Sequence, residues 1–160
     1  MLWATACASS TPQAPTNVAT GNSAFDEVSR SYLDDMYQRQ PTWATYLGIH
    51  KYNERLDDYS RKAVEDAVAS ARQFRGRLVA IDAASLVPER QLDREQLVRA
   101  MNSGVLGLDV IRRWAKDPDG YSGGITNAAY VIMKRGFAPA VDRLTSLIAR
   151  EKRMPASLAE

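Results

Sequence analysis

The chain has 160 residues, 45% of them hydrophobic and 25% charged, which is typical of one globular domain. Its 21 basic and 19 acidic residues leave a formal net charge of +2, and no dense run of lysine and arginine predicts nucleic-acid binding. A single cysteine and a single histidine exclude an internal disulfide and a closed structural zinc site within the chain. The sequence also lacks an HExxH, a P-loop and a dinucleotide-binding glycine motif.

Residues 1–22 are expected to precede the domain, which we place at 23–160. The segment Ala4-Thr5-Ala6-Cys7 resembles the end of a bacterial lipoprotein signal, in which Cys7 would carry the lipid anchor. The alternative is a short disordered leader that contains a cysteine by chance. The basic and apolar regions of a signal are incomplete, so the lipoprotein interpretation implies that Met1 is not the natural start. Residues 9–22 are rich in Ser, Thr, Pro and Ala, which predicts an extended linker.

From residue 23 onward, apolar residues recur at helical spacing, and no segment alternates with period two. We therefore predict an all-α fold of about five to six amphipathic helices. The first begins at Ser23 as N-cap, and its neighbouring carboxylates Asp34 and Asp35 are expected on a solvated face. Pro41 ends this helix and begins a short one that Gly48 closes.

Residues 49–59 form a polar, aromatic loop that contains the only histidine, His50. A histidine titrates near neutral pH, so His50 is a candidate ligand or base. With no second histidine or cysteine beside it, a structural hydrogen-bonding role is favoured. Asp57 and Asp58, followed by Ser60, are expected to cap the next helix.

Two long helices follow, over residues 61–81 and 88–115, the second opened by Pro88. Gly104 and Gly107 in the second helix predict either a close helix crossing or a kink, or are simply tolerated.

Residues 116–124 contain turn dipeptides and several glycines, which predict a break before a helix over 125–135. A phosphate-binding loop is disfavoured there, because no strand precedes it and no Lys-Ser/Thr follows it. Pro139 opens a further helix, and residues 155–160 look like the beginning of another that is cut short.

Motifs in a fixed order through residues 25–159 resemble the N-terminal part of the bacterial domain-of-unknown-function 885 family. The matching features include Leu47-Gly48-Ile49-His50 and Asp117-Pro118 with Tyr121. The most specific block is Arg135, Phe137-Ala138-Pro139, Arg143-Leu144, Ala149-Arg150-Glu151 and Pro155-Ala-Ser-Leu-Ala. One departure is Asn53, where the family pattern leads us to expect an aspartate, and this weakens a cation-binding role for that position.

The resemblance implies the N-terminal part of a larger helical metallocarboxypeptidase-like fold, in an exported, lipid-anchored protein of the periplasm or cell envelope. Zinc would be bound in the full-length protein by an HExxH-type helix downstream, and this chain would hold neither metal nor catalytic residues. The expected partners are the missing C-terminal catalytic half, a peptide substrate and the membrane, reached through Cys7. Within this chain, His50, Tyr52 and Tyr121 are the expected substrate contacts.

Two other functions stay open from the sequence. The first is a complete small helical lipoprotein that binds a partner, since five amphipathic helices can close a bundle. The second is an independent enzyme that uses His50 with Asp57 or Asp58. A large exposed apolar patch would favour the incomplete fold over the complete one.

Overall fold

A computed structural model describes residues 16–157, and within that range the protein is helical and contains no strand. The all-α prediction is therefore confirmed. The longer helices are α1 (Thr16–Arg39), α3 (Arg61–Val79), α4 (Pro88–Val105), α5 (Asp119–Lys134) and α6 (Ala140–Glu151). The short helices are α2 (Pro41–Tyr46) and α7 (Met154–Ser157), with 3-10 turns at His50–Tyr52, Ala83–Ser85 and Arg113–Ala115.

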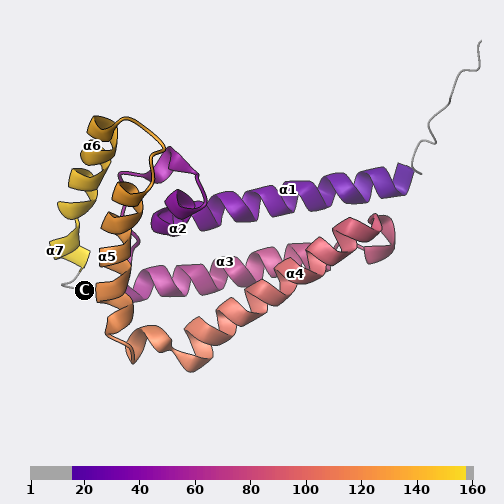
Figure 1. The fold of residues 1–160 in the computed structure, drawn as a ribbon. Coiled ribbons are helices and arrows are strands. Elements are labelled where there is room, and N and C mark those ends of the chain that lie inside the picture. The colour runs from indigo at the N-terminus through magenta and orange to yellow at the C-terminus, as the bar shows by residue number, and fades with distance from the viewer. Residues whose placement is uncertain (1–15, 158–160) are drawn as a thin grey trace, which may run out of the picture.

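Helices α1, α3 and α4 lie side by side as one layer, and α5, α6 and α7 stand across one end of that layer (Figure 1). The layer buries a core from all three helices and from the turn between α3 and α4. Its buried members are Phe25, Val28, Leu78, Leu86 and Met101. Burying each such side chain contributes about 1.5–3 kcal/mol, so the apolar stripes that define the helices also hold them together.

The short helix α2 packs against α5, and α5 packs against α6. Proline at the first position begins α2, and Gly48 follows it with a φ of 88°, which glycine adopts without strain. Buried residues from α2 and α5 meet here, which are Ala44, Thr45, Ile125, Ala128, Val131 and Ile132. The predicted short helix opened by Pro41 is thus confirmed, and it ends at Tyr46.

Helix α1 begins at Thr16, so the prediction of an extended linker is wrong for residues 16–22. Ser23 lies inside the helix, where its hydroxyl donates to the carbonyl of Ala19 instead of capping. These residues are held against the rest of the fold by a tertiary contact. Gly21 lies so close to Ser85 that a Cβ on residue 21 would overlap the carbonyl oxygen of Ser85. Asn22 also accepts a hydrogen bond from the Val87 amide at 3.2 Å. The remainder of the predicted leader, including Cys7, lies outside the described residues.

The predicted helix over 88–115 changes its character after Val105. Residues Leu106–Ile111 form a π-helical turn, and Arg112 then has a left-handed φ of 54°. Nothing lies within 4 Å of a Cβ built on Gly104 or Gly107, so a close helix crossing is not the reason for these glycines. The change from α-helix to π-helix after Val105 agrees with the alternative that the helix is locally distorted, as in a kink.

Helix α5 begins at Asp119, so the predicted break before residue 125 is too long. Glycines 120, 123 and 124 are helical despite their low intrinsic preference. Asp117 accepts a hydrogen bond from the Asp119 amide at 3.2 Å, which satisfies one free donor of the first turn. Gly124 is also needed for packing, because a Cβ there would overlap the Tyr59 hydroxyl. The glycine-rich segment is therefore the start of a helix.

Candidate functional site

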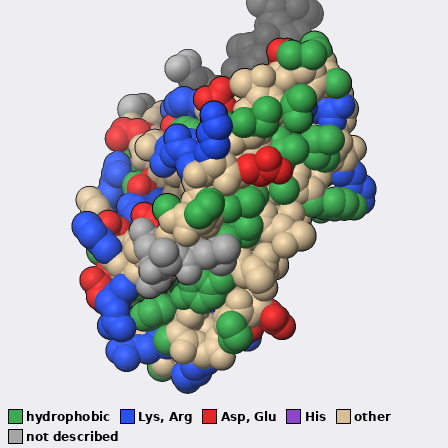
Figure 2. All heavy atoms as spheres, turned by 90° about the vertical axis from the view of Figure 1, so that its left-hand side faces the viewer, with side chains coloured by type: hydrophobic (Ala, Val, Ile, Leu, Met, Phe, Trp, Pro, Cys, Tyr) green, Lys and Arg blue, Asp and Glu red, His purple; other side chains and the backbone are tan. Residues whose placement is uncertain are grey.

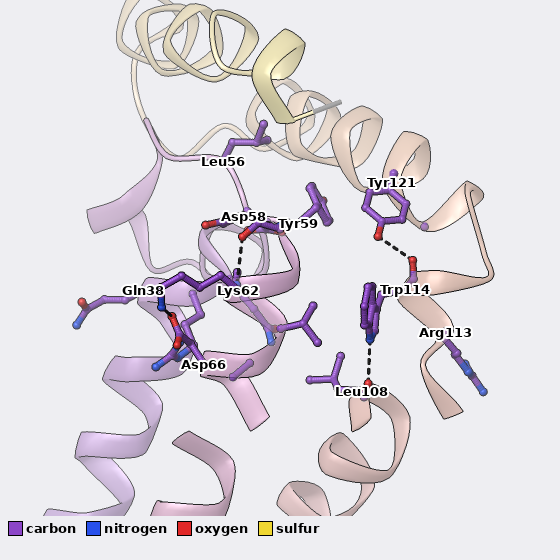
Figure 3. Close-up of a pocket in the computed structure, with 18 of the residues that line it drawn as sticks. Gln38, Leu56, Asp58, Tyr59, Lys62, Asp66, Leu108, Arg113, Trp114 and Tyr121 are labelled. Carbon is purple, nitrogen blue, oxygen red and sulfur yellow. Dashed lines mark hydrogen bonds and ion pairs between the residues drawn. The ribbon is translucent and has the colours of Figure 1, made fainter. Parts of the chain in front are cut away.

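A cavity of about 830 Å³ opens between the end of α1, the loop before α3, the beginning of α3 and the segment before α5. Its size is within the range of about 300–1,000 Å³ that is usual for small-molecule sites. Figure 3 shows Asp58, Tyr59 and Lys62 on one side of this cavity and Trp114 and Tyr121 on the other. We call it the α1–α3–α5 cavity.

Local hydrogen bonds shape the loop on the α3 side of the cavity. Ser60 caps α3 by accepting from the Ala63 amide at 3.1 Å, and Asp58 accepts from the Ser60 amide at 2.9 Å. Asp57 instead reaches across to α2, where it accepts from the Thr42 amide at 3.0 Å. Burial raises the pKa of Asp57, and the hydrogen bond from Thr42 opposes that rise. The predicted cap of α3 is thus confirmed for Ser60, which Asp58 supports through its amide, and it is wrong for Asp57, which bonds to the first turn of the preceding helix α2.

An aromatic wall faces this loop. The Tyr121 hydroxyl donates to the Trp114 carbonyl at 2.7 Å, and the Trp114 indole donates to the Leu108 carbonyl at 2.9 Å (Figure 3). The rings of Tyr59 and Tyr121 lie 5.5 Å apart. Burial and the nearby Asp57 raise the pKa of Tyr59 to about 12, so its hydroxyl stays protonated at neutral pH. The wall therefore presents the rings of Trp114 and Tyr121, each held by a hydrogen bond, and the neutral hydroxyl of Tyr59.

Most of the cations around the cavity already have partners. Arg39 pairs with Asp35 at 2.8 Å, and Lys62 pairs with Asp66 at 2.7 Å. The guanidinium of Arg55 lies over the ring of Tyr52, which does not line the cavity. Figure 3 shows the side chain of Arg113 directed away from the other labelled residues.

The sequence predicts that Asp34 and Asp35 are both exposed. Asp34 is exposed, whereas Asp35 is not. Asp35 is half-buried and accepts a hydrogen bond from the Ser70 hydroxyl at 2.6 Å, so it links α1 to α3. Burial acts to raise its pKa, but hydrogen bonds from Arg39 and Ser70 outweigh burial and lower it. The prediction of a solvated face is therefore wrong for Asp35, because the sequence does not show that Ser70 lies opposite.

The three expected substrate contacts do not come together. Tyr121 lines the cavity, whereas His50 and Tyr52 do not. His50 stacks on Phe137 with ring centroids 3.9 Å apart, and its Nδ1 lies 3.4 Å from the Asn53 side chain. Tyr52 is buried. His50 thus contacts Asn53 and Phe137, while Asp57 bonds to Thr42. The hypothesis of an enzyme that pairs His50 with Asp57 therefore gains no geometric support.

A buried arginine holds the neighbouring elements in place. Arg150 of α6 is 0% exposed, and its guanidinium donates to the carbonyls of Asn53 and Ala128, each at 2.7 Å. It also donates to the Thr45 hydroxyl at 2.7 Å and to the Pro41 carbonyl at 3.4 Å. Burial lowers the pKa of Arg150 to about 10, which leaves it charged at neutral pH. Arg150 belongs to the family motif Ala149-Arg150-Glu151, but nothing in the sequence predicts that its side chain is buried and bonded to several elements.

Asn53 belongs to the same network and is not a cation ligand in it. Its side-chain oxygen accepts from the Thr45 hydroxyl at 2.9 Å, and its carbonyl accepts from Arg150. Within residues 16–157, no group of three or more His, Cys, Asp and Glu side chains is arranged to hold a metal ion. None of the helices in that range is long and apolar enough to cross a membrane.

Residues 120–124 read Gly-Tyr-Ser-Gly-Gly, which fits the G-x-S-x-G spacing of a nucleophile elbow, a signal that the motif analysis above did not include. The structure does not form an elbow at this place. Ser122 lies in the first turns of α5, after a 3-10 turn and not after a strand, and its hydroxyl donates to the Asp119 carbonyl at 3.4 Å. Since the only histidine stacks on Phe137, no base is brought to Ser122.

Comparison with known families shows that the model of "Bacterial protein of unknown function (DUF885)" matches residues 41–160. The matched region begins at α2 and includes the loop before α3, the aromatic wall and Arg150. No curated protein and no solved structure matches the chain.

Proposed function

Because the chain belongs to the DUF885 family of bacterial proteins, we propose that it is the N-terminal, non-catalytic helical region of an exported, lipid-anchored protein that resembles zinc metallopeptidases. In this proposal the chain packs beside or over the active-site cleft of a C-terminal catalytic half. Zinc and the catalytic residues belong to that half, and Cys7 carries the lipid. The chain by itself is inactive.

The observation that carries this proposal is an apolar stripe on α6 that no described element covers. Val141, Leu144 and Ile148 recur on one helical face and are 74%, 48% and 42% exposed. Helix α6 packs against α5 and α7, and this stripe remains open on the other side. Tyr130 and Met133 of α5 are exposed as well. Such a set of large apolar side chains is typical of a surface that is covered in the assembled protein.

The surroundings of the stripe indicate what kind of surface would cover it. Figure 2 shows hydrophobic side chains gathered on the end of the molecule formed by α5, α6 and α7, with lysines, arginines and several acidic side chains around them. Lys134 lies over the Tyr130 ring, and Arg135 lies over the exposed ring of Tyr46 from α2. A complementary surface is therefore apolar at its centre and acidic at its rim.

The first test is an immunoblot of native cells with an antiserum against residues 61–115. We expect a species several times larger than the 17.7 kDa of this chain. That larger species should bind zinc. A species at or slightly below 17.7 kDa would overturn the proposal. It would favour the alternative of a small helical lipoprotein that binds a partner, for which the same stripe would be the docking surface.

The second test addresses the stripe in the large species. Replacing both Leu144 and Ile148 with lysine should expose the contact and increase the rate of limited proteolysis between the two halves. Leu92→Lys is the matched control, because Leu92 is also apolar, 65% exposed and helical, but lies on α4. Equal proteolysis of the double variant and the parent would contradict docking through α6.

A further inference from the structure

The α1–α3–α5 cavity combines aromatic ring faces with carboxylates whose charge is not neutralised by the cations around them. Asp58 and Asp117 each accept one backbone hydrogen bond through one oxygen, from Ser60 and Asp119 respectively. Neither carboxylate takes part in an ion pair within residues 16–157. Both line the cavity, so their second oxygens are free to accept hydrogen bonds from a ligand.

Four basic residues line the cavity, which are Arg39, Arg55, Lys62 and Arg113. Arg39 and Lys62 are paired with Asp35 and Asp66 within the protein. Arg55 and Arg113 take part in no ion pair within residues 16–157, but the guanidinium of Arg55 lies over the Tyr52 ring, and Figure 3 shows the Arg113 side chain directed away from the other labelled residues. The groups considered for contact with a ligand are therefore the carboxylates of Asp58 and Asp117 and the aromatic rings.

The aromatic wall also favours a positively charged ligand. The π face of an aromatic ring attracts a cation held within about 6 Å of its centre. Trp114 already has such a contact within the protein, since the guanidinium of Arg61 lies 5.4 Å from the ring centre. Tyr59 and Tyr121, whose rings are 5.5 Å apart, provide further faces toward the cavity.

From this combination we propose that the α1–α3–α5 cavity binds an organic cation, an alkylammonium or guanidinium group. The apolar stem of the ligand lies along Tyr59, Trp114 and Tyr121, and its charged end is held by Asp58 and Asp117. Such a group can belong to a basic side chain of a peptide or to a free polyamine. The inference does not depend on the docking of α6, since none of the stripe residues lines the cavity.

Titration calorimetry of the purified chain against small probes tests this site. The peptide probe is acetyl-Ala-Arg-Ala-amide, and its matched neutral probe carries citrulline, which keeps the shape of arginine without its charge. Spermidine represents the free polyamine. We expect the arginine peptide or spermidine to bind about tenfold or more tightly than the citrulline peptide, with affinity falling as salt is raised. Tighter binding of the arginine peptide would identify the ligand as a basic side chain of a peptide, and tighter binding of spermidine would identify it as a free polyamine.

The matching variant is Asp58→Asn with Asp117→Asn, because asparagine keeps the oxygen that accepts the local backbone hydrogen bond. We expect this double variant to bind the cation about tenfold or more weakly while its circular dichroism spectrum stays unchanged. Asp142→Asn, at an exposed position on α6, is the control and should bind like the parent. Equal affinity for the arginine and citrulline peptides, unchanged affinity in the double variant, or no binding of any cation would overturn the proposal.

Discussion

At the scale of single residues, the arrangement around the cavity depends on one buried cation. Arg150 donates to backbone or hydroxyl oxygens at Pro41, Thr45, Asn53 and Ala128, so α6 is joined to α2, to the turn after it and to α5. Each carbonyl would otherwise be left without this partner in the interior, which costs about 1–3 kcal/mol for each group. The burial of the guanidinium is therefore offset by hydrogen bonds and not by a direct ion pair.

Replacing Arg150 with methionine keeps much of its volume but leaves these acceptors without a donor. We expect the free energy of unfolding to fall by about 3–5 kcal/mol, measured by urea denaturation. Arg99→Met is the control, because Arg99 is exposed and paired only with Glu95 of the same helix, and should cost less than about 0.5 kcal/mol. A loss at Arg150 no larger than at Arg99 would show that the network does not stabilise the fold.

Asp35 provides a prediction on pH. Its pKa in the folded state is lower than the ordinary value of 3.8, since the hydrogen bonds from Arg39 and Ser70 outweigh burial. A lowered carboxyl pKa contributes stability above pH 3.8, and this contribution is lost as the pH falls through the folded-state pKa. Asp35→Asn should therefore destabilise the protein at pH 6, and the difference from the parent should shrink below pH 3.8.

Urea denaturation at a series of pH values measures this difference. Asp34→Asn is the matched control, because Asp34 is exposed and makes neither hydrogen bond, and it should stay within about 0.5 kcal/mol of the parent. A stability difference for Asp35→Asn that stays constant from pH 6 to below 3.8 would contradict the role of the ionised carboxylate.

At the scale of elements, the ends of α1 and α5 show how packing extends a helix beyond its local signals. The first turns of α1 contain Gly21, and those of α5 contain Gly120, Gly123 and Gly124. Glycine inside a helix costs about 1 kcal/mol relative to alanine. Two of these glycines repay that cost through close contacts, Gly21 with Ser85 and Gly124 with Tyr59.

Gly21→Ala separates helix propensity from packing. Alanine favours the helix by about 1 kcal/mol, but its Cβ would overlap the Ser85 carbonyl, so we expect a net destabilisation of about 1–3 kcal/mol. Gly76→Ala is the control on α3, where nothing lies within 4 Å of the new Cβ, and it should stabilise by about 0.5–1 kcal/mol. Thermal unfolding of the two variants measures both, and stabilisation by both would contradict the packing of α1 on the α3–α4 turn.

At the scale of the whole molecule, two packed groups of helices meet at the cavity. Helices α1, α3 and α4 share the core around Leu78 and Met101, while α2, α5 and α6 are joined through Arg150. The cavity takes its residues from both groups, and each side contributes aromatic and charged side chains. The open stripe of α6 lies in the second group, so docking and ligand binding are properties of different surfaces and can be tested separately.

The sequence by itself determined the features that depend on neighbours within one helical turn or one cap. The body of α3, the short helix α2 with Gly48, the cap at Ser60 and the all-α class were predicted correctly. The 3.6-residue period and capping are local properties, and they can be read from consecutive residues. The match to DUF885 agrees with the family resemblance drawn from the ordered motifs.

Only the tertiary structure decided which residues are brought together from distant parts of the chain. The start of α1 depends on Ser85 and Val87, the burial of Arg150 depends on Asn53 and Ala128, and the cavity joins Tyr59 to Tyr121. His50 and Tyr52, expected like Tyr121 to contact a substrate, do not line the cavity. Such contacts join residues that are far apart in sequence, so no local pattern of periodicity or capping contains them.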